Sequence, residues 1–125
     1  MHEVGLMENV LQMVQTSARD QGLSTVRRIK LVVGELSMAL PESLRFAFAA
    51  LVEHDMFQGM FHQTVLEIEE RPLECQCGMC GHRFPGRRFT CPLCRADQVR
   101  IVSGRELYVD YYEGEALDDQ SRPGT

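Results

Sequence analysis

Residues 75 to 94 read CQCGMCGHRFPGRRFTCPLC, and this stretch contains all five cysteines of the chain. Its two Cys-x-x-Cys knuckles, CGMC and CPLC, are separated by ten residues. Each knuckle can place two sulfurs about one metal ion, and two knuckles complete a tetrahedral tetrathiolate. The sequence therefore predicts a structural zinc site with four ligands, Cys77, Cys80, Cys91 and Cys94. Iron is the leading alternative, since tetrahedral sulfur sites also suit it.

A closed site of four cysteines has no open position for water, so it stabilises structure and does not catalyse. Cys75 is ambiguous because it lies two residues before Cys77 and could compete for the metal. His82 is another candidate substitute ligand, although a solvated turn histidine is the simpler interpretation. Neither knuckle opens a helix in a βαβ unit, as a thioredoxin-like redox motif would.

The composition of the whole chain is that of an ordinary globular protein, with 125 residues, 44% hydrophobic and 25% charged. A net charge of −5 argues against general binding to nucleic acid or to anionic membranes. No segment approaches the roughly 18 apolar residues of a membrane span, and the N-terminus lacks the pattern of a signal peptide. We therefore expect a cytoplasmic protein, because a reducing compartment keeps thiols free for metals. The sequence has no Gly-rich phosphate loop, nucleophile elbow or HExxH, so it does not predict an enzyme.

Hydrophobic periodicity predicts an α/β fold around the cysteine-rich stretch. Helices are expected over residues 6–18 and 41–54, and strands over residues 26–34, 64–70, 99–102 and 106–112. The last strand can return to the sheet made by the first two, so the cysteine-rich module is expected to be an insertion.

The expected architecture is a small domain of two helices packed on a roughly three-stranded sheet, with an inserted tetrathiolate zinc ribbon of rubredoxin-like type. The α/β domain is expected to span residues 1–72 and 104–114, and the zinc-binding domain residues 73–103. The polar residues 115–125 are expected to form a disordered tail.

The first three residues, Met1, His2 and Glu3, offer a second set of metal donors. The Met1 α-amine, the deprotonated His2 amide nitrogen and the His2 imidazole can form fused chelate rings on one ion. The Glu3 carboxylate or amide can complete the plane. A square-planar, nitrogen-rich set favours Ni(II) or Cu(II) over zinc. The simpler interpretation is a frayed terminus, with Glu3 favourably placed before a helix.

Together these features resemble the HypA (HypA/HybF) family. The resemblance extends from Met1 to about Glu113 and rests on MHE followed by Val-Gly-Leu, on VVGELS at residues 32–37, and on CQCGMC with CPLC. Two positions depart from the family pattern, Gly5 where Ser is common and Arg95 where Gly is frequent.

The resemblance implies a nickel metallochaperone for the maturation of [NiFe]-hydrogenase. Ni(II) would be the transferable cargo at Met1, His2 and Glu3, and Zn(II) a structural ion at the four knuckle cysteines. The implied partners are the GTPase HypB and the precursor of the hydrogenase large subunit, with neither nucleic acid nor a membrane among them. Some relatives also supply nickel to urease. The sequence leaves open whether the chain forms a homodimer.

Arginines around the knuckles support an alternative function, that of a zinc-ribbon module that binds nucleic acid or another protein. The cluster comprises Arg83, Arg87, Arg88, Arg95 and Arg100. Such a basic patch can contact phosphates or dock an acidic protein, and we favour docking over nucleic-acid binding.

Overall fold

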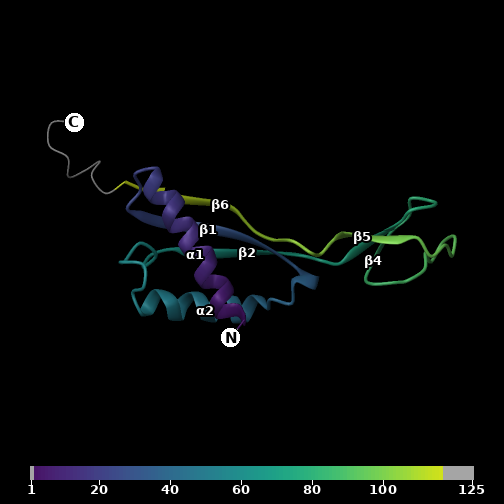
Figure 1. Cartoon of the computed structure of the whole chain (residues 1–125), viewed down its shortest axis with the longest axis horizontal. Coiled ribbons are helices and arrows are strands. Elements are labelled where there is room, and N and C mark those ends of the chain that lie inside the picture. The colour runs from purple at the N-terminus through teal and green to yellow at the C-terminus, as the bar shows by residue number, and fades with distance from the viewer. Residues whose placement is uncertain (1, 117–125) are drawn as a thin grey trace. The chain divides into compact units, whose positions relative to one another are not determined.

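The computed structural model of the chain describes residues 2–116, apart from the side chain of His2. Met1 and residues 117–125 lie outside the described residues, and with them most of the expected tail. The elements in chain order are α1 (His2–Asp20), β1 (Thr25–Gly34), the 3-10 helix η1 (Glu35–Ser37), α2 (Pro41–Glu53), β2 (Val65–Arg71), β3 (Glu74–Cys77), β4 (Arg83–Pro85), β5 (Val99–Ser103) and β6 (Leu107–Glu115) (Figure 1). Neither helix of this described part combines the length and the apolar character that a membrane crossing requires.

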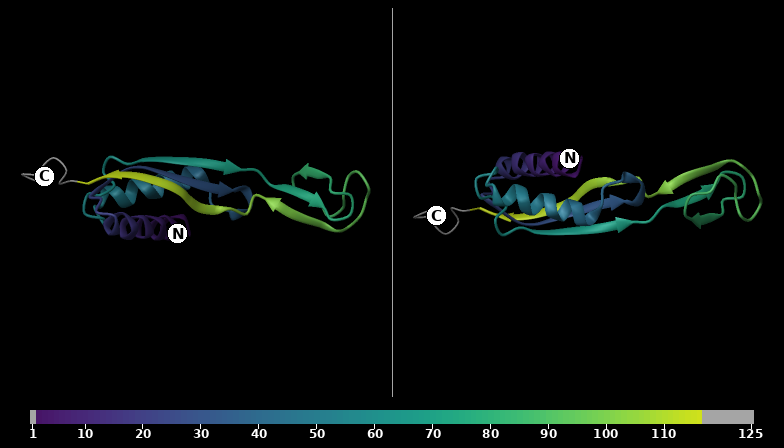
Figure 2. Two further views of the ribbon diagram at one scale, coloured as in Figure 1. Left: turned by 90° about the horizontal axis from the view of Figure 1, so that it is seen from above. Right: turned by 90° about the horizontal axis from the view of Figure 1, so that it is seen from below.

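Two three-stranded sheets form, with the strand orders β2-β1-β6 and β4-β3-β5. The last strand of the chain thus joins the sheet of the first two, which confirms the predicted α/β fold with an inserted module. The strands of the second sheet lie between β2 and β6 along the chain, and the cysteine-rich stretch runs from β3 toward β5 (Figure 2).

The described residues divide into two compact units. The first comprises the residues up to Leu31, Leu40–Ile68, and those from Val109 onward, and the second comprises Val32–Ala39 and Glu69–Tyr108. The second unit therefore contains the cysteine-rich module together with the ends of β1 and β2. The domain bounds expected from the sequence remain a prediction.

Helix α1 begins at His2, four residues before the start that hydrophobic spacing predicts. The expected start was wrong because apolar periodicity marks only the turns that face the core, whereas the first turn contains Glu3, which suits the positive end of a helix dipole. The helix ends at Asp20, and Gly22 follows it with a φ of +78°, which few other residues adopt. The N–H of Leu23 donates to the carbonyl of Ala18 at 2.9 Å, the bond that closes a Schellman motif.

The core of the first unit lies among α1, α2, β1 and the loop that follows α2. Phe61 is its largest fully buried side chain, and its ring meets that of Phe57 edge to face at a centroid distance of 5.3 Å. Pro41 occupies the first turn of α2, where its fixed φ and missing N–H cost nothing. The other buried side chains of this unit include Met7, Leu11, Val14, Val26, Ile29, Leu31, Leu44 and Leu66.

The second unit contains two strands that the sequence pattern did not predict, β3 and β4. β3 pairs antiparallel with both β4 and β5. Cys75 lies opposite Phe84 in β4 and opposite Ile101 in β5. Their buried residues are cysteines and one phenylalanine, so the usual alternation of aliphatic residues is missing. The small core of the module consists of Cys75, Cys77, Phe84 and Cys91, against which Ala96, Val99 and Ile101 pack.

Close backbone contacts hold the end of β1 to the segment that leads into β6, within the second unit. The N–H of Gly34 donates to the carbonyl of Glu106 at 2.6 Å, and the N–H of Leu36 donates to the carbonyl of Gly104 at 2.7 Å. The Glu35 carboxylate accepts the backbone N–H of Leu73 at 2.8 Å. The facing backbone leaves no room for a Cβ atom at position 34, so this contact requires glycine there.

Candidate metal centre

The sulfur atoms of Cys77, Cys80, Cys91 and Cys94 all lie within 4.8 Å of one another. The Sγ atoms of Cys77 and Cys94 are 3.6 Å apart, and those of Cys80 and Cys91 are 3.7 Å apart. A tetrahedral zinc with Zn–S bonds of about 2.3 Å requires sulfur–sulfur distances of about 3.8 Å. The four thiols therefore already have the spacing of a tetrathiolate metal site. They are the same four residues that the knuckle spacing predicts.

The two knuckles have the same backbone geometry. The Cys77 sulfur accepts the N–H groups of Met79 and Cys80 at 3.3 and 3.4 Å. The Cys91 sulfur accepts the N–H groups of Leu93 and Cys94, again at 3.3 and 3.4 Å. Each knuckle thus directs two backbone dipoles at its first sulfur, an arrangement that stabilises a thiolate.

Each knuckle ends at a residue with a left-handed backbone. The N–H of Gly81 donates to the carbonyl of Cys77 at 3.0 Å, and the N–H of Arg95 donates to the carbonyl of Cys91 at 2.9 Å. The φ values are +81° at Gly81 and +66° at Arg95. Glycine adopts this conformation freely, whereas another residue loses about 1–2 kcal/mol. The second knuckle therefore holds an arginine in a conformation that favours glycine.

The hydrogen bonds at the knuckles change the acidity of the thiols. The backbone N–H groups of Cys80 and Met79 lower the pKa of Cys77 to about 6. Although desolvation raises the pKa of Cys91, the backbone N–H groups of Cys94 and Leu93 lower it below its ordinary value. Although the N–H of His82 lowers the pKa of Cys80, desolvation and the neighbouring thiols raise it to about 12. The backbone N–H groups of the two knuckles therefore favour the thiolate forms of Cys77 and Cys91, and the thiolate is the form that binds metal.

Cys75 does not belong to the cluster. Its side chain is buried, and its thiol donates to the carbonyl of Gly86 at 3.3 Å. The His82 ring instead stacks on Phe84, with a centroid distance of 5.8 Å. Neither candidate substitute ligand therefore belongs to the cluster. Cys75 is part of the module core, and the His82 ring packs on Phe84.

A comparison with known protein families identifies the chain. The family model described as "Hydrogenase/urease nickel incorporation, metallochaperone, hypA" matches residues 1–114. The chain belongs to the HypA family. Family members are nickel-incorporation metallochaperones for hydrogenase maturation, so this chain is a maturation factor and not an enzyme.

Individual relatives agree with the family assignment. The chain is 38% identical over 121 residues to the hydrogenase maturation factor HypA of Moorella thermoacetica, covering 92% of this chain and 100% of the relative. A solution structure of HypA protein matches 93% of this chain and 98% of its own, with a TM-score of 0.68 and 22% identity. The solution structure of the Ni metallochaperone HypA from Helicobacter pylori matches 91% of this chain and 97% of its own, with a TM-score of 0.61 and 20% identity. These two structures establish the fold of the HypA-family chain.

Of the three predicted nickel ligands, the described residues include the complete side chain of Glu3 only. Glu3 lies in the first turn of α1, and its side chain is half-buried. The family model covers all three positions, but the nickel site of this HypA-family chain remains a prediction.

Outside the cysteine cluster, the Nε2 atom of His62 lies 3.2 Å from Asp55 Oδ1. The turn at Gly59, with a φ of +80°, lies between the two residues and accounts for their approach. Both side chains are mostly exposed, so this pair on the HypA-family surface contributes at most about 1 kcal/mol to stability.

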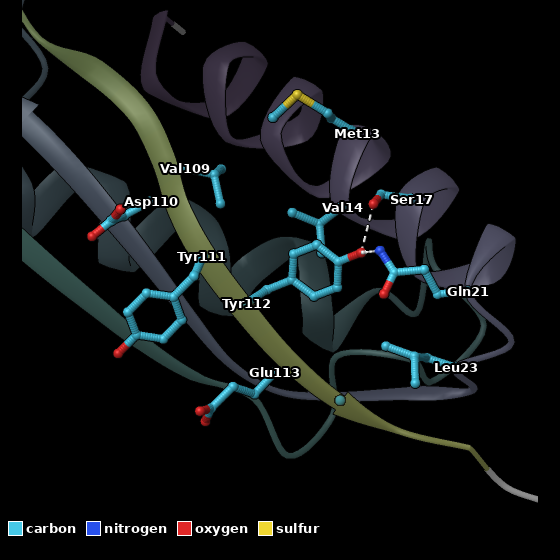
Figure 3. A pocket seen from close by; sticks show the side chains of 11 residues that line it. Met13, Val14, Ser17, Gln21, Leu23, Val109, Asp110, Tyr111, Tyr112 and Glu113 are labelled. Carbon is cyan, nitrogen blue, oxygen red and sulfur yellow. Dashed lines mark hydrogen bonds between the residues drawn. The ribbon is translucent and has the colours of Figure 1, made fainter.

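A groove of about 680 Å³ lies between α1 and β6 in the first unit (Figure 3). The Tyr112 hydroxyl crosses it, 2.5 Å from Ser17 Oγ, and accepts the Gln21 side-chain amide at 3.0 Å. The two carboxylates that line the groove form ion pairs with basic residues. Asp110 pairs with Lys30 at 3.8 Å, and Glu113 pairs with Arg28 at 3.6 Å. The groove therefore offers no free set of metal ligands to the HypA-family chain.

Proposed function

We propose that this chain binds Ni(II) at Met1, His2 and Glu3 and delivers it to the precursor of the [NiFe]-hydrogenase large subunit. The observation that carries the proposal is the match to the nickel-incorporation family, which covers residues 1–114 and so includes this tripeptide. Zn(II) occupies the cluster of four cysteines and has a structural role. The GTPase HypB is the partner in delivery, and the process takes place in the cytoplasm.

The position of His2 at the start of α1 supports a nickel site that includes backbone nitrogen. The first four N–H groups of an α-helix have no intrahelical acceptor. A metal ion can therefore displace the His2 amide proton without breaking a helical hydrogen bond. A nitrogen-rich set of this kind suits Ni(II), and its small number of protein ligands suits an ion that must be released.

The two metal sites differ in the way that delivery requires. The cysteine cluster offers four sulfurs at tetrahedral spacing and leaves no position for an exchanging ligand. The terminal site keeps open positions that a receiving protein can use for ligand exchange. We therefore assign retention to the cysteines and transfer to the N-terminus.

We expect His2→Ala to lose nickel and to keep zinc. Even the outer partners of metal ligands change affinity by about 10–100-fold, so removal of a direct ligand should weaken nickel binding by more than about a hundredfold. Metal analysis and nickel titration of purified protein measure both quantities. His62→Ala, which removes an imidazole elsewhere on the surface, is the matched control and should bind nickel normally. Unchanged nickel affinity in His2→Ala would refute the site.

Nickel affinity should fall steeply as the pH falls from about 7.5 to 6. Metal binding requires an unprotonated imidazole and α-amine, whose ordinary pKa values are about 6.5 and 7.7–8.0, and it also displaces an amide proton. Protons therefore compete more strongly at each lower pH, and affinity should drop about tenfold or more per pH unit. Competition titration with a chelator of known pH dependence measures the slope. A pH-independent affinity would exclude the proposed nitrogen ligands.

Delivery itself is tested with a nickel-free hydrogenase precursor under limiting nickel. The nickel-loaded chain should restore hydrogenase activity, whereas His2→Ala should not. Excess free nickel should rescue maturation in the presence of the variant. Restoration by His2→Ala at limiting nickel would contradict delivery from the N-terminal site.

A further inference from the structure

The cysteine-rich module reverses the charge of the chain. The whole protein has a net charge of −5, yet residues 73–103 contain five arginines and only two acids, Glu74 and Asp97. The hydrogen bonds to the sulfurs of Cys77 and Cys91 come from backbone N–H groups and not from these arginines.

Three of the five arginines have no partner among residues 2–116. Arg83 forms an ion pair with Glu74, and Arg100 donates to the Gln76 side chain at 3.2 Å. Arg87, Arg88 and Arg95 are exposed, and no hydrogen bond or ion pair engages their guanidinium groups within that described range. All three lie within four residues of Cys91 or Cys94 along the chain.

Large apolar side chains are exposed among these free arginines. Phe89, which follows Arg88, is 83% exposed. Met79 and Leu93 occupy the third position of the two knuckles and are 65% and 68% exposed. Because the two knuckles share one sulfur cluster, both side chains emerge next to the metal centre. The stretch from residue 79 to residue 95 therefore exposes three large apolar side chains together with the three free arginines.

The backbone of Arg95 adds an independent observation. The equivalent position of the first knuckle is Gly81, and both residues have positive φ. Glycine would remove the strain at position 95, so the arginine side chain is retained at a cost in stability. Strain of this kind is typical of positions where the side chain has a role in binding.

We propose that this knuckle surface binds an acidic segment of another protein that also presents an apolar side chain. The surface comprises Met79, Arg87, Arg88, Phe89, Leu93 and Arg95. The free guanidinium groups pair with carboxylates, and the apolar side chains between them bury an aliphatic or aromatic residue of the partner. Nucleic acid fits less well, since three free cations give few phosphate contacts and the remainder of the chain is strongly acidic. The proposal goes beyond nickel delivery and does not depend on the nickel site.

The test measures peptide binding to the zinc-loaded full-length chain by fluorescence anisotropy. The probes are a labelled peptide of alternating glutamate and leucine, a peptide of alternating lysine and leucine, and single-stranded oligothymidylate of equal length. The glutamate peptide should bind most tightly, and its affinity should fall with added salt.

The decisive variant is the triple replacement Arg87→Ala, Arg88→Ala and Arg95→Ala. It should weaken binding of the glutamate peptide on the order of tenfold, since each exposed ion pair makes a modest contribution. The matched control replaces Arg19, Arg27 and Arg105 with alanine, which lowers the net charge by the same three units away from the knuckles. Phe89→Ser tests the apolar part and should also weaken binding. Zinc content and circular dichroism establish that each variant is folded.

Three results would overturn the proposal. These are equal weakening by both triple variants, tighter binding of oligothymidylate than of the glutamate peptide, and no peptide binding at low salt. Nickel titration of the same samples separates this proposal from the proposed function. A chain that binds the glutamate peptide but not nickel would count against the proposed nickel site and would leave the peptide-binding proposal standing.

Discussion

We expect Cys91→Ser to abolish zinc binding and to unfold β3, β4 and β5. Structural zinc in small domains contributes about 10–16 kcal/mol of apparent binding free energy, which is as large as the whole stability of many domains. Three of the four buried residues in the module core are cysteines, Cys75, Cys77 and Cys91. Without the metal, so few apolar groups cannot offset the conformational entropy of the module.

Metal analysis and amide hydrogen exchange measure this outcome. The variant should contain no zinc, and the amides of β3 and β5 should lose protection while those of α1 and α2 keep theirs. Cys75→Ser is the matched control, because the sulfur of Cys75 lies outside the cluster. The serine hydroxyl can still donate to the Gly86 carbonyl, as the thiol does. It should retain one zinc per chain. Retention of zinc by Cys91→Ser would show that another residue replaces Cys91 as a ligand.

Gly34→Ala should destabilise the chain by about 3 kcal/mol or more. A Cβ atom at position 34 would lie 2.2 Å from the carbonyl oxygen of Gly104 and 2.6 Å from the backbone nitrogen of Glu106. Both neighbours are backbone atoms, so the two backbone segments must separate. The separation also stretches two short hydrogen bonds, from Gly34 to Glu106 and from Leu36 to Gly104. Overpacking costs about 1–3 kcal/mol, and each lost hydrogen bond adds about 1 kcal/mol.

Urea unfolding at constant zinc concentration measures the loss. Gly5→Ala is the control, since a Cβ atom at that position meets nothing within 4 Å and the residue lies inside α1. It should stabilise the chain by about 0.5–1 kcal/mol, the usual preference for alanine over glycine in a helix. A Gly34→Ala variant as stable as the unmodified chain would contradict the close approach of the two backbones.

Sequence patterns predicted the regular elements of the first unit better than those of the second. The core side chains of α2 and β1 are mostly aliphatic, so periodicity located both elements to within one residue at their starts. In β3 and β4 the buried residues are Cys75, Cys77 and Phe84, so no alternation of aliphatic residues indicates a strand. The start of α1 was placed too late because its first turn has few contacts with the core.

The cluster of four cysteines could be predicted because a repeated Cys-x-x-Cys spacing leaves few other interpretations. The role of Cys75 could not, since a thiol two residues from a knuckle is compatible with either a ligand or a core residue. Pairing of β3 with β4 and β5 decides between them by directing Cys75 toward Phe84 and Ile101. The sequence also could not predict that Arg87, Arg88 and Arg95 form no ion pairs within residues 2–116. Ion pairing depends on which acidic residues lie nearby in space.

The sequence by itself determined that this chain has an α/β fold with an inserted four-cysteine module, and it placed candidate metal donors at the N-terminus. Both features are local, since knuckle spacing and a tripeptide are read along the chain. Only the tertiary structure decided which thiols have their pKa lowered by backbone N–H groups and which cysteine packs in the core outside the cluster. It also decided why position 34 requires glycine. These properties depend on distances between residues that are far apart in sequence, and such distances exist only once the chain has folded.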